Sequence, residues 1–285
     1  MIGKPLFDPN VVHLIRQDYK VVKCKSCQFY YVHPKIDLSL NEWSELYGNE
    51  YFLELNEWYK EERLKDIKSR LSRMISYKHT HDKANFLDLG CGEGLALIES
   101  LKKKWNAFGC DISDNRTQDA KQNDIFFELS DLISAHYPND FFDFIHMDSV
   151  LEHLINPVDY LKELNRIMKK GGIIYIGVPN ENSLFDNFRQ LAFKFIGKAK
   201  FSAKLRPFET PFHIGGFTEK SLRIIASIAD FEVVEIKNFA THFEFRKYPS
   251  NSKSFWVHFL TLPIDIFSIP LKMEKYYSAY FRKIK

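Results

Sequence analysis

Three glycines at alternate positions mark the segment FLDLGCGEGLAL, and a carboxylate stands just before them in an apolar run. These four residues are Asp88, Gly90, Gly92 and Gly94. Because glycine has no Cβ, a loop with this spacing lets a ligand approach the backbone closely. The spacing does not fit a Walker loop, which ends in Gly-Lys-Ser/Thr. It also fails the Gly-x-Gly-x-x-Gly dinucleotide fingerprint, whose last glycine would fall at Leu95.

A second carboxylate, Asp111, lies 21 residues after Gly90, at the end of the next apolar run. That distance suits an acid that accepts two hydrogen bonds from a ribose diol, in NAD or in any other nucleoside. Asp88, beside the loop, would repel a pyrophosphate but would suit a cofactor with an ammonium group and a cationic sulfur. The two carboxylates therefore favour a nucleoside cofactor without a phosphate.

The apolar pattern around these residues alternates short continuous runs with helical periodicity. We expect buried strands at 85–89, 107–110, 125–129, 142–147 and 173–178, and helices at 94–104 and 157–169. Strands that alternate with helices form an α/β fold, in which helices cover both faces of a parallel sheet. Ligands bind such sheets at the carboxyl ends of the strands, where the glycine loop and Asp111 lie.

Four further segments complete this pattern. An amphipathic helix is predicted at 58–77, and Thr218 is a suitable N-cap for a helix that leads to a strand at 231–236. The apolar segment 255–273 is predicted to be a helix that joins the last two strands and packs mainly on the core. A final strand is predicted at 276–284.

Five motifs in order resemble those of class I S-adenosylmethionine-dependent methyltransferases. They are LDLGCGEG, FGCDIS (108–113), LSDLI (129–133), the segment 142–180 and the segment 211–236. The resemblance covers roughly residues 45–240. It implies a Rossmann-like, seven-stranded, mostly parallel sheet with the last strand antiparallel. It also implies that S-adenosyl-L-methionine is the methyl donor.

The resemblance also implies roles for single residues. The three glycines form the floor under the methionyl part, Asp88 orients its amino group, and Asp111, next to Ile112, holds the ribose hydroxyls. Asp131 accepts from the adenine amine, Leu132 donates a backbone N–H or packs on the ring, and the methionyl end is bordered by Met147 and Asp148. For Asp131 and Asp148 the alternative is a helix cap or a turn.

An alcohol acceptor needs a base within hydrogen-bond reach. His153, which follows the fourth strand, is the first candidate because the unperturbed pKa of histidine, about 6.5, suits a base at neutral pH. His213 is the second candidate and Glu152 the third. The alternative is that Glu152 and His153 only hold the turn before the next helix. No set of histidines and carboxylates shows the spacing of a metal site.

Cys24 and Cys27 have the spacing of half a zinc site, and His13 and His33 are conceivable further ligands. We expect a metal-free hairpin that packs over the pocket. The four cysteines do not form a disulfide framework, and no signal peptide is visible. These features favour a reducing cytoplasm.

The chain is nearly neutral, with a net charge of +3, but residues 187–206 carry six basic residues and no acid. We expect a hairpin or cap at 1–50 and a methyltransferase domain at 51–285, in which 181–216 is a lid or substrate-binding insertion. The partners predicted are a small-molecule acceptor, anionic or lipid-linked, and a membrane surface touched peripherally, with no nucleic acid. The function predicted is methylation of a hydroxyl on a small molecule, a sugar of surface polysaccharides or a glycolipid. A non-catalytic cofactor-binding module and an NAD-dependent oxidoreductase are the alternatives.

Overall fold

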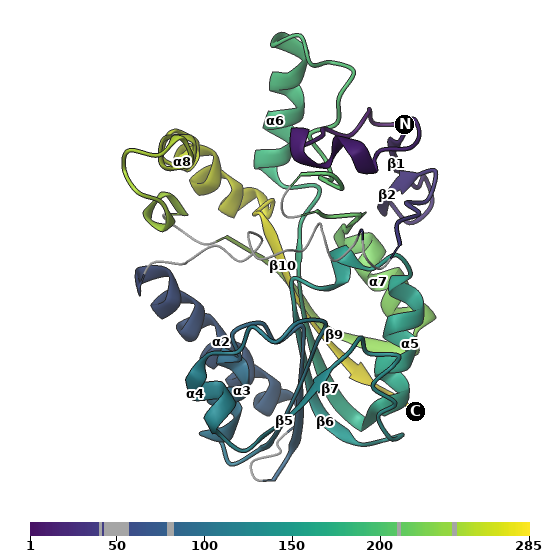
Figure 1. Cartoon of the computed structure of the whole chain (residues 1–285), viewed down its shortest axis with the longest axis vertical. Coiled ribbons are helices and arrows are strands. Elements are labelled where there is room, and N and C mark those ends of the chain that lie inside the picture. Colours follow the sequence, from purple (N-terminus) through teal and green to yellow (C-terminus); the bar gives the residue numbers. More distant parts are fainter. Residues whose placement is uncertain (40–41, 43–56, 79–82, 210–211, 241–243) are drawn as a thin grey trace.

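The computed structural model describes residues 1–39, 42, 57–78, 83–209, 212–240 and 244–285. Its centre is a seven-stranded sheet (Figure 1). In spatial order the strands are β5 (Ile125–Leu129), β4 (Asn106–Asp111), β3 (Asn85–Leu89), β6 (Phe142–Asp148), β7 (Met168–Pro179), β10 (Tyr276–Lys283) and β9 (Phe231–Phe239). The pairs from β5 to β7 are parallel, and β10 is antiparallel to both of its neighbours. The predicted α/β fold with an antiparallel last strand is confirmed.

Helices cover both faces of this sheet, and each face has its own apolar core. On one face α2 (Glu57–Lys78) and α3 (Leu95–Leu101) bury Leu71, Met74 and Leu97, with the short α4 (Gln118–Gln122) alongside. On the other face α5 (Pro157–Ile167) and α7 (Glu219–Ile228) bury Leu161 and Leu222 with their neighbours at helical spacing. As predicted, Thr218 caps α7: its side chain accepts from the Ser221 N–H.

The N-terminal hairpin and the insertion after β7 form a single cap. Strands β1 (Lys20–Lys23) and β2 (Tyr30–His33) pair antiparallel around the Cys24–Cys27 turn, as predicted. Strand β8 (Gly215–Gly216), from the end of the insertion, adds to β2 and completes a three-stranded sheet. Apolar side chains from both segments share one core, namely Tyr19, Val21, Tyr30, Leu205, Phe208 and Ile214. The two regions predicted separately are therefore one unit.

Two helices project beyond the carboxyl edge of the sheet, next to this cap (Figure 1). They are α6 (Leu184–Phe195), inside the insertion, and α8 (Lys253–Leu271), between β9 and β10. Helix α8 does join the last two strands, as predicted. The expectation that it packs mainly on the core is wrong, since only 11% of its apolar stretch is buried. In the part of the chain that the structure describes, there are also three short 3-10 helices, η1 (Pro9–Leu14), η3 (Leu151–His153) and η4 (Glu244–Lys247).

Candidate active site

The glycine loop joins β3 to α3 with an extreme backbone conformation. Gly90, Gly92 and Gly94 all have positive φ, at 70°, 50° and 80°, which side chains rarely tolerate. A Cβ on Gly90 would collide with the Val150 side chain, so this glycine lets the loop pack against the segment after β6. A Cβ on Gly92 would meet nothing within 4 Å. The loop is therefore closed on one side and open above Gly92, where a ligand can lie on the backbone.

Asp111, at the end of β4, supports this loop from the neighbouring strand. One carboxylate oxygen accepts from the Gly92 N–H at 2.9 Å and the other from the Ser113 N–H at 3.1 Å. Burial is the largest influence on its pKa and raises it, although these N–H groups oppose the shift. The next side chain, Ile112, is 67% exposed. A fixed carboxylate next to an uncovered apolar side chain suits the sugar and the base of a nucleoside.

Asp88 lies below the loop in a buried polar pair. Its Oδ1 is 2.7 Å from Nδ1 of His146 on β6, and both residues are 4% exposed. The imidazole stacks on the Tyr175 ring with 5.1 Å between centroids. In this structure Asp88 therefore fixes β3 to β6, and a group above the loop can meet it only through water or after a local shift.

The two residues predicted for the adenine side, Asp131 and Leu132, both make contacts within the protein. Both carboxylate oxygens of Asp131 hold the following turn, through the N–H groups of Ile133 and Ser134 and the Ser134 hydroxyl. This is the turn-forming role that was the alternative. Leu132 is fully buried in the core, so the expectation that its side chain packs on the adenine ring is wrong. Met147 is also fully buried.

Asp148 closes β6 with an ion pair that sequence reasoning missed. Arg70 on α2 contacts it at 2.5 Å, and the guanidinium also lies over the Tyr175 ring, 4.6 Å from the centroid. Burial is the largest influence on the pKa of Asp148 and raises it, but the charge and hydrogen bond of Arg70, together with weaker charge interactions such as that of Arg63, hold the pKa below its ordinary value. Asp148 is thus more than a turn residue, because it joins α2 to the carboxyl edge of the sheet.

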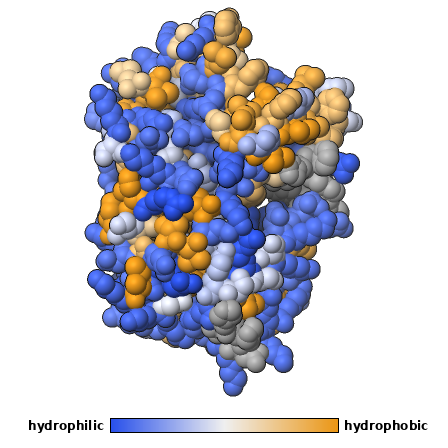
Figure 2. Space-filling view, turned by 180° about the vertical axis from the view of Figure 1, so that it is seen from behind, coloured by the Kyte–Doolittle hydropathy of each residue, from blue (hydrophilic) through white to orange (hydrophobic). Residues whose placement is uncertain are grey.

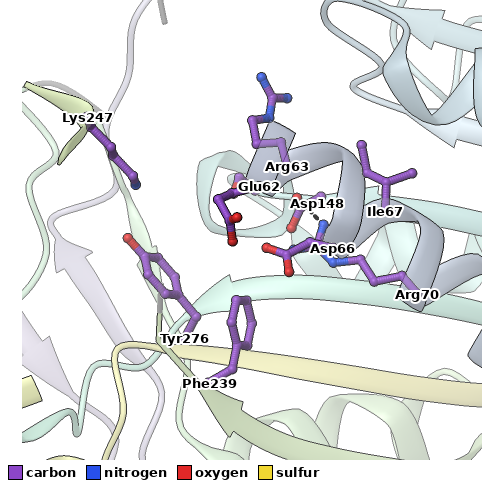
Figure 3. A pocket seen from close by; sticks show the side chains of 10 residues that line it. Glu62, Arg63, Asp66, Ile67, Arg70, Asp148, Phe239, Lys247 and Tyr276 are labelled. Atoms are coloured by element: carbon purple, nitrogen blue, oxygen red, sulfur yellow. Dashed lines mark hydrogen bonds and ion pairs between the residues drawn. The ribbon is translucent and has the colours of Figure 1, made fainter. Parts of the chain in front are cut away.

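A polar pocket of about 130 Å³ opens beside this ion pair (Figure 3). Helix α2 contributes Glu62, Arg63 and Asp66 to its wall, while Phe239, Lys247 and Tyr276 face them from the opposite side. Arg63 also pairs with Glu93 of the glycine loop at 2.9 Å. The pocket therefore lies next to the loop and offers both signs of charge, which suits a zwitterionic group.

The three candidate bases come together in space although 60 residues separate two of them in the chain. Nε2 of His213 is 3.8 Å from Oε1 of Glu152, and the rings of His153 and His213 meet edge to face with 5.1 Å between centroids. The His153 side chain hydrogen-bonds to the backbone of Phe212, next to His213. A backbone bond from the Ile214 N–H to the Glu152 carbonyl, 3.0 Å long, completes the junction.

Burial controls the electrostatics of this cluster. Glu152 is 1% exposed and neither of its carboxyl oxygens has a hydrogen-bond partner, and burial raises its pKa to about 8. Burial lowers the pKa of His153 to about 4 and that of His213 well below its ordinary value. The expectation that the pKa of His153 suits a base at neutral pH is wrong, because the ring is desolvated. Both imidazoles are neutral at pH 7.

The same three side chains could hold a metal ion, since their ligand atoms all lie within 4.8 Å of one another. Sequence spacing gave no sign of this group. Among the described residues it is the one such cluster, so the thiols of Cys24 and Cys27, both free and half-buried, gain no third ligand there.

A mostly parallel sheet with an open glycine loop and a fixed carboxylate at its carboxyl edge is typical of the Rossmann-like class of folds. The model of the family described as "Methyltransferase domain" matches residues 57–236. The chain belongs to this family, and its fold is that of S-adenosylmethionine-dependent methyltransferases.

Relatives and solved structures agree with this assignment. Demethylmenaquinone methyltransferase of Staphylococcus epidermidis is 26% identical over 48% of this chain and 64% of its own length. An uncharacterised Streptomyces fradiae transposon protein is 27% identical, and the match spans only 33% of its length. The chain thus spans less than two thirds of these curated relatives. A SAM-dependent methyltransferase structure from Archaeoglobus fulgidus shares the fold at a TM-score of 0.53 and 21% identity, over 80% of this chain and all of that one.

Proposed function

We propose that the protein transfers a methyl group from S-adenosylmethionine to a hydroxyl group of a small molecule or sugar. The observation that carries this proposal is the junction of two sites at one edge of the sheet. The nucleoside site of Gly92 and Asp111 lies on one side, and the buried Glu152–His213 pair lies on the other. Val150, which packs against Gly90, joins them.

The residues present fit the cofactor. The open backbone at Gly92 gives it a floor, Asp111 has lone pairs left for two ribose hydroxyls, and the exposed Ile112 can cover the base. The charged pocket at Asp148 and Arg63 can receive the amino-acid end. When bound, the cofactor supplies a methyl group on a sulfonium, which is a good leaving group. The chemistry supplied there would be transfer of this methyl group to an acceptor oxygen, with the sulfur keeping the electron pair of the carbon–sulfur bond.

The chain's own contribution is to orient the acceptor and remove its proton. With Glu152 ionised, the His213 imidazole can accept the hydroxyl proton, because the carboxylate 3.8 Å away stabilises the resulting imidazolium. His153 holds the loop of His213 through the Phe212 backbone and is a positioning residue. This reverses the order expected from sequence, in which His153 came first.

A second hollow, near the two histidines, can admit the acceptor. A hollow of about 310 Å³ lies between the cap hairpin and the segments that directly follow both histidines, with Leu154 and Ile214 in its wall. Phe29, His33 and Lys35 line its other side. This mixture of apolar and basic groups suits a ring compound that carries an anionic substituent.

Cofactor binding tests the proposal first. Calorimetry with S-adenosylmethionine should give a Kd that Asp111→Ala weakens by about 100-fold, the loss expected for two hydrogen bonds to a charged group. Asp114→Asn is the matched control: it removes an Asp on the same loop that pairs with Arg116 at 2.9 Å, outside the site. Binding of NADH in place of S-adenosylmethionine would instead establish the oxidoreductase alternative.

The second test of the proposed function measures turnover. Phenols, nucleotide sugars and glycolipids are incubated with the protein and S-adenosylmethionine, and S-adenosylhomocysteine is measured by mass spectrometry. Acceptor-dependent release of this product is expected. Tight cofactor binding without release for any acceptor class would favour the non-catalytic module.

A further inference from the structure

Helix α8 has the reverse orientation of an ordinary surface helix, which buries its apolar side chains and exposes its polar ones. Its buried residues are polar, since Asp265 is 5% exposed and Ser268 is 3% exposed. The side chains that it presents to solvent are apolar and large: Trp256, Leu260, Phe267 and Leu271 are between 53% and 71% exposed. Their spacing places these four opposite Asp265. Further exposed apolar side chains, Val257, Phe259, Ile266 and Ile269, extend the apolar surface around the helix. Exposure of large apolar side chains to water is unfavourable, so contact with water does not explain this orientation.

The polar side of α8 is fixed to the protein by ion pairs. Asp265 contacts Lys275 at 2.9 Å, and the same ammonium contacts Glu244 of η4 at 2.8 Å. By length and composition the helix could cross a membrane. To do so, it would have to break these buried pairs and pull on β10, which begins at Tyr276 and is paired on both sides. These contacts favour a helix that lies on a bilayer over one that spans it.

Helix α6 continues the apolar surface. Phe188, Leu191, Phe195 and Ile196 are 50% to 81% exposed and again share one side of their helix. The two helices are in contact, and the Leu184 N–H bonds to the Met273 carbonyl at 2.8 Å, which ties the start of α6 to the end of α8. Figure 2 shows the apolar side chains gathered over this end of the molecule.

The charge on this surface is basic. Exposed lysines flank the apolar side chains of both helices, namely Lys194, Lys198, Lys200, Lys253 and Lys272. Residues 187–206 contain no acid, and the one acid of α8, Asp265, is buried. Lysine is depleted from protein–protein interfaces, whereas lysines beside exposed aromatic and leucine side chains are typical of helices that lie on anionic membranes.

We propose that α6 and α8 form a lipid-docking face that lies on the surface of an anionic bilayer. The apolar side chains enter the headgroup boundary, and the flanking lysines contact phosphates. The carboxyl edge of the sheet then faces the membrane, which brings Lys247 and Tyr276 of the polar pocket close to lipid. The proposal requires no methyl transfer, so it stands or falls separately from the proposed function.

Flotation with vesicles tests the face directly. The wild-type chain is mixed with phosphatidylcholine vesicles that contain phosphatidylglycerol, at low salt. The double variant Leu260→Glu, Phe267→Glu should lose at least tenfold in partition, because two charges replace side chains that are 71% and 67% exposed and that enter the lipid. Ile228→Glu on α7, at a residue that is 50% exposed, is the matched control and should partition like wild type.

A second pair of substitutions tests the lysines of this face. Lys198→Glu with Lys200→Glu should reduce partition at least tenfold on anionic vesicles, since each basic residue near such a surface contributes a factor of about five. Thermal midpoints and S-adenosylmethionine affinity of all variants are measured as checks of folding. Failure of the wild-type chain to float at low salt, or equal flotation of the double variant, would overturn the proposal. A dimer in analytical ultracentrifugation that the double variant dissolves would instead assign the face to a second copy of the chain.

Discussion

Two buried glutamates, Glu152 and Glu244, have opposite surroundings. Glu244 is 5% exposed, and basic side chains surround it: Lys275 at 2.8 Å, His258 at 3.3 Å and Lys247 at 3.4 Å. Glu152 is 1% exposed, its carboxyl oxygens have no hydrogen-bond partner, and His213 is 3.8 Å away. Burial therefore raises the pKa of Glu152 to about 8. At Glu244 the histidine and the two lysines outweigh burial and hold the pKa far below its ordinary value.

The difference separates a structural carboxylate from one that is available for chemistry. A buried charge is stable only when partners replace the water that it loses. Glu244 has such partners, and they hold η4, α8 and β10 together. Glu152 lacks them, and it lies beside two histidines at the carboxyl edge of the sheet. Unpartnered groups of this kind cluster at functional sites, so we assign the chemistry to Glu152 and the stability to Glu244.

The largest effect is expected from Glu152→Gln. The amide keeps the shape of the side chain but cannot stabilise an imidazolium on His213, so kcat should fall by about 1,000-fold, within the range for general-base removal. The affinity for S-adenosylmethionine, measured by calorimetry, should stay within about twofold. Full turnover in this variant would show that the acceptor needs no base here.

Glu244→Gln should have the opposite profile. It removes the anion that Lys247 and Lys275 share and leaves Asp265 as the remaining anionic partner of Lys275. Breaking a buried ion pair costs about 3 kcal/mol of unfolding free energy. Urea denaturation should record this loss, while kcat below the unfolding range should remain close to wild type. An unchanged unfolding midpoint, or a loss of turnover as large as that of Glu152→Gln, would remove the contrast between the two carboxylates.

Smaller losses of kcat are expected from the two histidine variants. His213→Asn should lower kcat by about 100-fold because it removes the proton acceptor. His153→Asn, which only alters the support of the Phe212 loop, should lower it by about tenfold and leave the shape of the pH profile unchanged. The reverse order would restore His153 as the base.

The pH dependence follows from the raised pKa of Glu152. Its base form is the carboxylate, so kcat should rise with pH through about 8, and Glu152→Gln should lose this limb. The sign for stability is opposite. Between the ordinary pKa of 4.5 and about 8 the native state holds the proton and the unfolded state does not, so stability falls as the pH rises through this window.

Thermal unfolding at pH 6 and pH 9 measures the stability difference, which should be smaller in Glu152→Gln. The depressed pKa of Glu244 predicts the reverse for its own cluster: its contribution is complete above the ordinary pKa and is lost as the pH falls toward the folded value. A Glu152→Gln variant with the same pH slope as wild type would contradict the raised pKa.

The fold and the cofactor side could be predicted because their signals are local. Each strand is a continuous apolar run, and the glycine loop lies within a dozen residues. Asp111 was placed correctly beside the loop, since the carboxyl ends of adjacent parallel strands meet at one edge of the sheet. The sequence could not show that Leu132 lies in the core, because it belongs to a turn after β5 whose side-chain directions depend on tertiary packing.

The acceptor side could not be predicted because its contacts join distant segments. Asp148 meets Arg70 of a helix 78 residues earlier. Glu152 meets His213 of a distant segment, which the Ile214 N–H holds at the Glu152 carbonyl. The orientation of α8 could not be predicted from the sequence either. The apolar composition of α8 is typical of a core helix. The ion pair of Asp265 with Lys275, which turns the apolar side outward, exists only after folding.

The assignment of Glu152 is tested most directly by infrared difference spectroscopy of its carboxyl group. Spectra of the wild-type chain and of Glu152→Gln, recorded from pH 5 to pH 9, isolate the carbonyl band of the protonated side chain. The account predicts a band that is present at pH 7 in the wild type only and that disappears around the pKa of about 8. A Glu152 that is already ionised at pH 6 would contradict it, because such a carboxylate would need a partner that this site does not provide.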